Sequence, residues 1–265
     1  MSALLRNLLL AAVGLFLALP LIVVAGISVN QGQQLLFPPK GFSLSWYLDV
    51  FAASDWRNAL QNSLFIAVCS ATLSVSIALP LAYVVWHRGG GIARALFAVG
   101  LAPFTLPPVI SALGFLVFWI NAGGYGQMYA TIISHSIFLV TLPLVTIALG
   151  FESIDRQLIE AARTMGATDR KLFATVVLPL IRPYLISGFA FAFVLSLNEY
   201  IIAYMVSGFT VETLPIKIFN ALRYGYTPIM AAVSVIFVLV AVIVFSLIAR
   251  FGDLPKLMGA WSGDT

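Results

Sequence analysis

The sequence predicts an all-α integral membrane protein with six transmembrane helices and a cytoplasmic helix-turn-helix between the fourth and fifth of them. The first observation is composition: 61% of the 265 residues are hydrophobic and only 9% are charged, with a mean hydropathy of +1.03. A soluble domain needs a more charged exterior than these residues could form. The second is that apolar runs of about 20 residues, the length that crosses a bilayer, recur along the chain. The third is that many of the charges gather in one polar segment, residues 151–182.

We expect one transmembrane domain, residues 1–265, whose spans lie at about residues 8–29, 63–85, 95–120, 128–150, 183–206 and 228–248. The first run follows Arg6. It is long and has no A-x-A site with a polar region behind it, so we interpret it as an uncleaved span rather than a signal peptide. The second run lies between Arg57 and His87.

The third and fourth spans share an uncharged stretch, residues 95–151, which is long enough for two passes. The polar, glycine-rich segment "NAGGYGQ" at residues 121–127 is the expected turn between them. The fifth span follows Arg182, and the sixth lies between Arg223 and Arg250.

The distribution of basic residues predicts the orientation. With the N-terminus inside, the cytoplasmic segments hold Arg6, Arg88, Arg94, Arg156, Arg163, Arg170, Lys171, Arg182, Arg250 and Lys256. The opposite side holds Lys40, Arg57, Lys217 and Arg223. This positive-inside bias places both termini and the polar segment in the cytoplasm. It also accounts for the net charge of +4 without nucleic acid, since no basic patch with interleaved aromatic residues is present.

Proline residues interrupt the third span at Pro103, Pro107 and Pro108. Proline removes a backbone donor and kinks or breaks a helix. Irregular backbone at membrane depth is tolerated where it is buried in protein or lines a watery cavity. The sequence leaves two interpretations open: a kink that serves packing, and an element of a solute pathway or gate.

Glu199 is a carboxylate about two-thirds of the way across the fifth span. An ionisable residue at that depth is costly and by default suggests function. It could face a cavity and meet a cationic or amine-bearing solute, or it could pair with Asn198, Tyr200 or a polar group on another helix. Asn198 is a second candidate for the pathway by the same argument.

No catalytic or metal-binding pattern is found in the sequence. There is no GxSxG, HExxH, CxxC or phosphate-binding GxxxxGK[ST] motif, and the single cysteine, Cys69, has no partner. His135 in the fourth span is expected to be a hydrogen-bonded packing residue. A membrane-embedded enzyme needs two convergent reactive groups, and only His135 and Glu199 stand at depth, on different spans. We therefore expect no catalytic centre, no metal site and no ATP site in this chain.

The polar segment begins with an amphipathic helix. Its apolar positions recur at helical spacing and are Leu158, Ile159, Ala162 and Met165. On the polar face, Glu160 stands within ion-pair spacing of Arg156 and Arg163. Such a helix can lie on lipid or dock into a groove on a partner, and periodicity does not choose between the two.

A turn and a second short helix are expected to follow. Gly166 permits the turn, and Thr168 can cap the second helix. We expect Leu178–Pro179 to end that helix and Pro183 to begin the next span.

The run "EAARTMG…VVLP" resembles the EAA signature of permease subunits of ABC importers. The matching residues are Glu160, Ala161, Ala162, Gly166, Leu178 and Pro179, while Val176 stands where the signature prefers isoleucine. The resemblance implies a type I permease with six spans, in which this segment forms a coupling helix that inserts into a cleft of the ATPase subunit. It implies that Glu160, Ala161, Ala162 and Gly166 transmit the motion of the ATPase to the spans.

The later run "NEYIIAYMVSGFTVETLPIKIFNALRYGYTPIMAA" is similar to permeases of the spermidine/putrescine-type branch. The matching residues are Glu199, Thr213, Leu214, Pro215, Ile218, Phe219 and Pro228. This similarity implies import of a small organic solute such as a polyamine or related amine. A permease for an inorganic ion is the alternative within the family, and a secondary transporter or channel is the alternative outside it.

The resemblance also implies partners and a location. These are a second permease subunit in a heterodimer, two ATP-binding subunits that hold the ATP, and a periplasmic or tethered solute-binding protein. The expected outer contact surfaces are residues 30–57 and 207–227. The chain would be a multi-pass protein of the bacterial inner membrane, in contact with lipid.

Overall fold

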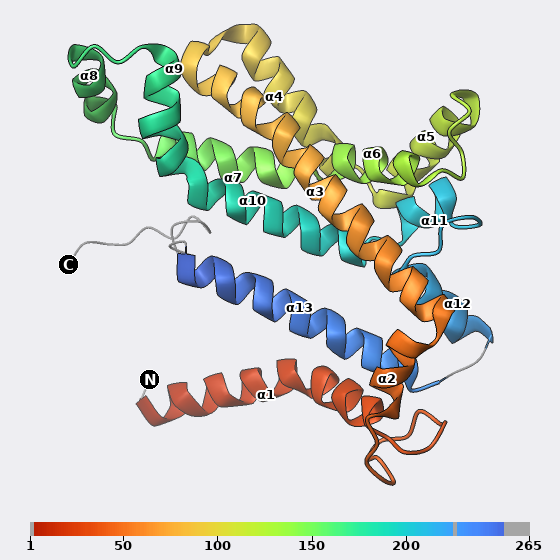
Figure 1. Ribbon diagram of the computed structural model, residues 1–265. Helices are drawn as coiled ribbons and strands as arrows, with labels where there is room; N and C mark the ends of the chain where they lie inside the picture. Colours follow the sequence, from red (N-terminus) through yellow and green to blue (C-terminus); the bar gives the residue numbers. More distant parts are fainter. Residues whose placement is uncertain (1–2, 225–226, 252–265) are drawn as a thin grey trace. The chain divides into compact units, whose positions relative to one another are not determined.

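The computed structural model describes residues 3–224 and 227–251 of the chain (Figure 1). Within these residues the regular elements are helical, apart from an isolated β-bridge between Asn30 and Phe42. The chain divides into two compact units, one of residues 1–60 and 216–242 and the other of residues 61–215 and 243–265. Lys256, which contributes to the expected cytoplasmic charge, and the C-terminus itself lie outside the described residues.

The first unit contains α1 (Ala3–Ser28), α2 (Ser45–Ala52) and the first turns of α3 (Ser54–Arg88), with most of α12 (Leu214–Tyr224) and the first part of α13 (Ile229–Phe251). Trp46 Nε1 donates a 2.7 Å hydrogen bond to the Asn30 carbonyl. Lys217 Nζ lies 2.9 Å from Asp55 Oδ2, and the same ammonium lies 5.8 Å from the centre of the Trp56 ring. These contacts fix the segment after α1 and the start of α3.

Four helices are long and apolar enough to cross a membrane, at residues 4–28, 54–88, 169–198 and 229–246. Two further candidates are bent pairs: α4 (Gly90–Thr105) with α5 (Pro108–Asn121) at 106°, and α6 (Met128–Leu139) with α7 (Thr141–Glu152) at 45°. The described residues therefore hold four candidate spans, or up to six if each bent pair crosses as one.

The third predicted span is not one straight helix. The chain breaks at Leu106 and Pro107, and both have extended backbone angles. Pro107 cannot donate the hydrogen bond that would continue α4. Pro108 stands in the first turn of α5, where its missing N–H costs nothing because that group would have no helical partner. The two prolines thus break the predicted span into two helices that meet at a bend of 106°, here called the elbow.

The second short helix of the polar segment does not end at Leu178–Pro179, so that expectation is wrong. α9 (Asp169–Leu172), a π-helical turn at Phe173–Val177 and α10 (Leu178–Asn198) form one continuous helix. The Leu178 N–H bonds to the Phe173 carbonyl five residues back. We attribute the continuity to this wider π turn, which makes room for the proline that follows it.

The fifth predicted span also differs from expectation, because its helix stops before residue 206. α10 ends at Asn198, Glu199 has extended backbone angles of φ −75° and ψ 122°, and a separate helix, α11 (Ile201–Ser207), follows. Glu199 therefore stands at a break in the helix instead of inside it.

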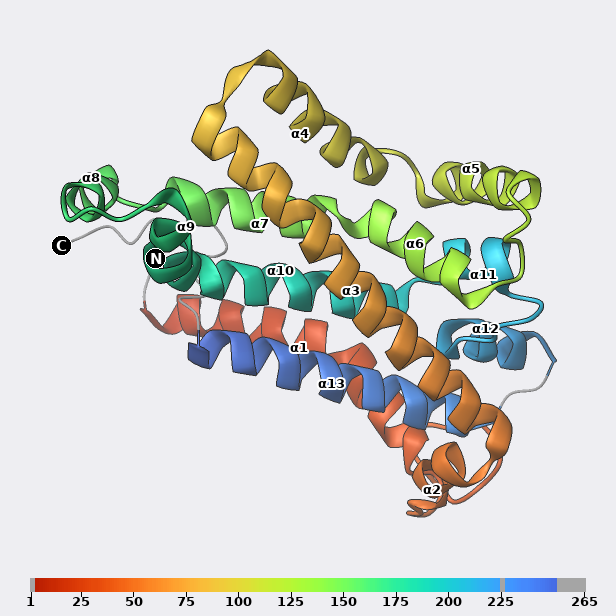
Figure 2. The ribbon, with the colours of Figure 1, turned by 45° about the horizontal axis from the view of Figure 1, so that its top comes forward.

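The core of the second unit lies where α7 packs beside α10, which both views show (Figure 2). Gly188 permits this approach, since a Cβ atom there would lie 2.9 Å from the Pro143 Cα. α6 is held to α3 by two hydrogen bonds, which Ser70 and Ser74 of α3 donate to the carbonyls of Ile132 and Ser136. These contacts set the position of α6.

Candidate functional site

The Glu199 carboxylate accepts hydrogen bonds from the start of the helix that follows it. Oε1 and Oε2 each lie 3.0 Å from the Ile202 nitrogen, and Oε2 lies 3.1 Å from the Ala203 nitrogen. The first N–H groups of a helix have no partner within the helix, so a carboxylate at this position satisfies them. The break in the chain and the carboxylate therefore belong together: Glu199 caps α11.

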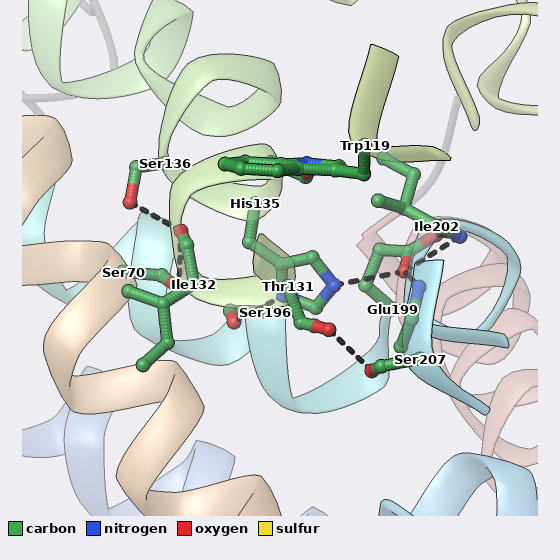
Figure 3. A network of polar contacts seen from close by, with 12 residues as sticks. Ser70, Trp119, Thr131, Ile132, His135, Ser136, Ser196, Glu199, Ile202 and Ser207 are labelled. Atoms are coloured by element: carbon green, nitrogen blue, oxygen red, sulfur yellow. Dashed lines mark hydrogen bonds and ion pairs between the residues drawn. The ribbon is translucent and has the colours of Figure 1, made fainter. Parts of the chain in front are cut away.

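His135 is the partner of Glu199 on another helix (Figure 3). Its side chain is fully buried on α6. Nδ1 lies 2.8 Å from Ser196 Oγ, and Nε2 lies 3.1 Å from Glu199 Oε2, off the line of an ideal hydrogen bond. The expectation of a hydrogen-bonded packing histidine is confirmed. In the described part of the chain, no group of three histidine, cysteine or carboxylate side chains could hold a metal ion.

Further polar contacts surround this pair, all within the second unit (Figure 3). Trp119 Nε1 on α5 donates to Ser134 Oγ at 2.8 Å. The hydroxyls of Thr131 and Ser207 share a hydrogen bond between α6 and the end of α11. Buried polar groups are costly unless they are paired, so these bonds restrict how the surrounding helices can pack.

A cavity of about 580 Å³ opens beside the break. Its lining residues are Phe104, Leu106, Pro108, Phe138, Leu139, Leu195, Asn198, Glu199, Tyr200 and Ile201. Glu199 is the only charged side chain among them. Asn198 donates to the Val194 carbonyl of its own helix at 2.8 Å. The structure thus brings both residues predicted for the pathway to one cavity, where a carboxylate and apolar walls suit an ammonium group on an aliphatic chain.

The polar segment forms the predicted helix-turn-helix at its start. α8 (Arg156–Thr164) is capped by Asp155, whose carboxylate accepts from the Gln157 N–H at 2.9 Å. The turn contains Gly166 at φ +81°, a left-handed conformation that favours glycine. Thr168 Oγ1 accepts from the Lys171 N–H at 3.4 Å, which confirms the second cap.

The charges of this segment pair differently from expectation. Arg163 Nη2 lies 3.3 Å from Asp169 Oδ1, across the turn. The expected partner of Arg163 was Glu160. Both side chains are more than half exposed, so this pair contributes little stability.

Every residue of α8 remains at least partly exposed. Ile159 and Ala162 pack against the core of the second unit, whereas Leu158 is 50% exposed and Met165, at the end of the helix, is 88% exposed. Glu160, Ala161 and Gly166 are also exposed. The helix therefore has one apolar side against its own chain and another that is accessible to a partner.

The sequence did not identify His135 as the partner of Glu199, nor Asp169 as the partner of Arg163. A signal for the first was present, because residues 128–150 and 183–206 contain no acidic residue, histidine, lysine or arginine other than His135 and Glu199. A buried carboxylate needs a polar partner, and His135 was the one histidine, lysine or arginine in these two spans. The second pair had no such signal, because it depends on how tightly the turn at Gly166 closes.

Comparison with known proteins gives consistent matches over most of the chain. The model of the family "binding-protein-dependent transport system inner membrane component" matches residues 74–253. The putrescine transport system permease protein PotI of Escherichia coli K12 is 32% identical over 226 residues, which cover 83% of this chain and 80% of that protein. The spermidine/putrescine transport system permease protein PotC of Haemophilus influenzae is 29% identical over 253 residues, covering 93% of this chain and 96% of that protein.

Solved structures have the same fold. A chain of a bacterial alginate ABC transporter, in complex with an alginate pentasaccharide-bound periplasmic protein, aligns with a TM-score of 0.65 at 18% identity. The alignment covers 98% of this chain and 96% of that one. A chain of an inward-facing methionine ABC transporter aligns with a TM-score of 0.61 at 20% identity, covering 77% of this chain and 94% of that one.

Proposed function

This chain belongs to the family of binding-protein-dependent transport system inner membrane components, and we propose that it is the permease subunit of an ATP-driven ABC importer for a small organic amine. The chain contributes the membrane pathway, and the chemistry of ATP takes place on separate subunits. The polyamine permeases that it resembles over most of its length support an amine as the solute.

One observation carries the solute class: among the described residues that line the cavity beside the helix break, Glu199 alone has a charged side chain. A carboxylate beside apolar walls attracts a cation more strongly than it would in water, because the low dielectric screens its charge less. The apolar walls contributed by Phe104, Leu106 and Leu195 suit the methylene groups of an alkylamine. In this proposal Glu199 and Asn198 contact the solute on its way across the membrane.

The proposed topology has six spans, in which each of the two bent helix pairs crosses the membrane once. The positive-inside bias supports cytoplasmic termini and a cytoplasmic position for α8 between the fourth and fifth spans. Leu106 and Pro108, on the two sides of this break, line the cavity, which favours the pathway interpretation of the prolines over a kink that serves packing alone.

The proposed coupling element is α8 with the turn that follows it. Glu160, Ala161, Ala162 and Gly166 are in or next to a short helix that presents an accessible apolar side. We propose that this side docks into a cleft of an ATPase subunit. Because Ile159 and Ala162 pack on the core around α7 and α10, motion of the docked helix would pass directly to those spans.

The proposed assembly has a second, different permease subunit, two ATP-binding subunits and a periplasmic or tethered binding protein. Closure of the ATPase dimer would move the coupling helices and switch the pathway between inward- and outward-facing states, as in alternating access. The binding protein would deliver solute to the outer face, where we place residues 30–57 and 207–227.

The test is co-purification of the native chain with its partners, alongside Glu160→Ala and Gly166→Pro. We expect the native chain to retain an ATP-binding subunit and both variants to lose it. Proline cannot adopt the φ of +81° found at Gly166, so it distorts the turn. A chain that purifies alone and still moves putrescine into vesicles would contradict the ABC assignment and indicate a secondary transporter.

A further inference from the structure

The two oxygens of the Glu199 carboxylate have unequal numbers of partners. Oε2 accepts from the Ile202 and Ala203 N–H groups and lies 3.1 Å from His135 Nε2. Oε1 has one hydrogen bond among the described residues, from the same Ile202 N–H. An ionised carboxylate offers about four acceptor positions. Oε2 therefore already has three close partners, whereas Oε1 can still accept a hydrogen bond from another group.

We propose that His135 is a positioning residue for solute passage: it holds Glu199 Oε2 so that Oε1 is available to the ammonium group of the solute. This inference rests on the proposed function, in which Glu199 contacts an amine. His135 itself is not among the residues that line the cavity. Its effect on the solute is therefore exerted through Glu199.

The contact between His135 Nδ1 and Ser196 Oγ is compatible with a ring proton on Nε2, the nitrogen that faces the carboxylate. An unprotonated ring nitrogen would repel a carboxylate oxygen at 3.1 Å, so Nε2 must carry hydrogen. The Ser196 hydroxyl, 2.8 Å from Nδ1, can donate to that nitrogen and so leave the ring proton on Nε2. Among the described residues Nε2 makes no hydrogen bond of ideal geometry, and its contact with Glu199 Oε2 at 3.1 Å is a close polar contact off that line. Among the described residues, the Glu199 carboxylate is therefore the polar group that His135 Nε2 contacts.

The contact between His135 and Glu199 also joins two parts of the fold that are far apart in the sequence. His135 is on α6, whereas Glu199 stands at the break between α10 and α11. Without His135, the N–H groups of α11 would be the remaining donors that orient the carboxylate. The carboxylate could then turn about its own side-chain bonds, and Oε1 would lose its fixed direction.

Two substitutions at position 135 separate the two ring nitrogens. In His135→Gln the amide nitrogen can reach the place of Nε2 and donate to Oε2. In His135→Asn the shorter amide can reach only the place of Nδ1 and leaves Oε2 without the 3.1 Å contact that Nε2 makes. Both variants are polar and smaller than histidine, so they form a matched pair for the loss of packing.

The assay is import of radiolabelled putrescine into vesicles by the complete complex of both permeases, ATPase subunits and binding protein. For His135→Asn we expect the maximal rate to fall about tenfold, the low end of the range for losing a polar partner of a charged group. The solute concentration for half-maximal import stays unchanged, because the binding protein captures the solute. His135→Gln stays within about twofold of the native rate, since its donor is retained.

Retention of the ATPase subunits reports whether each variant assembles. If His135→Asn does not assemble, Ser196→Ala serves instead, with a severalfold fall in maximal rate expected. Equal rates for the two His135 variants, or a native rate for His135→Asn, would overturn the positioning role. A tenfold loss in Glu199→Gln beside a native rate in His135→Asn overturns this inference alone. A native rate in Glu199→Gln overturns the proposed role of Glu199 and this inference with it.

Discussion

Substitution of Met165 tests whether the accessible side of α8 binds an ATPase subunit. Met165 has the highest exposed fraction, 88%, among the large exposed apolar side chains of the described residues. In the isolated chain this side chain contributes little to folding, because nearly all of it already contacts solvent. Replacement of an exposed residue usually changes the free energy of unfolding by less than about 0.5 kcal/mol.

The expected effect on docking is larger. Full burial of a methionine side chain contributes about 1.5–3 kcal/mol. Since 88% of Met165 is exposed, a partner could bury almost the whole side chain. Met165→Ala retains the Cβ atom, so we expect a loss of about 1–2 kcal/mol of binding free energy, which is a roughly five- to thirtyfold weaker dissociation constant.

The assay is binding of the purified ATPase subunit to the immobilised permease pair, with thermal unfolding of each variant measured in parallel. Ile92→Ala is the matched control, because Ile92 is 82% exposed but belongs to the first turn of α4. We expect the control to bind like the native chain. Unchanged binding by Met165→Ala, with native thermal stability, would refute the assignment of this surface.

Two further predictions concern glycines. Gly166 has φ +81°, and a Cβ atom added there would meet open space. Asparagine tolerates this conformation better than alanine, for which it costs about 1–2 kcal/mol, so Gly166→Asn should retain more ATPase subunit in co-purification than Gly166→Ala. The opposite order would contradict the role of the turn. In Gly188→Ala the new Cβ would lie 2.7 Å from Thr146 Oγ1 and 2.9 Å from the Pro143 Cα. We expect a loss of about 1–3 kcal/mol in thermal unfolding, whereas Gly114→Ala, which meets open space, should lose nothing.

Composition and periodicity were sufficient to predict the helical class, the apolar runs and the polar segment between them. These features depend on neighbours within one or two helical turns, so they can be interpreted along the chain. The turn at Gly166 and the cap that Thr168 forms on the next helix are likewise local, and the residue types there allow few other conformations. The presence of a costly carboxylate at Glu199 was equally evident, because no other acidic residue lies in that apolar run.

The tertiary structure decided what those elements do together. Whether a proline bends, breaks or merely widens a helix depends on the packing around it, which is why Pro107 produces an elbow whereas Pro179 follows a π turn within a continuous helix. The contact between His135 and Glu199 depends on α6 packing beside the break after α10, and the two residues are far apart in sequence. The sequence by itself placed a carboxylate in an apolar run. Only the packing of the helices decided which residue pairs with this carboxylate and which cavity it lines. The partner comes from α6 and the cavity is lined by residues of several helices, and these segments are far apart in the sequence.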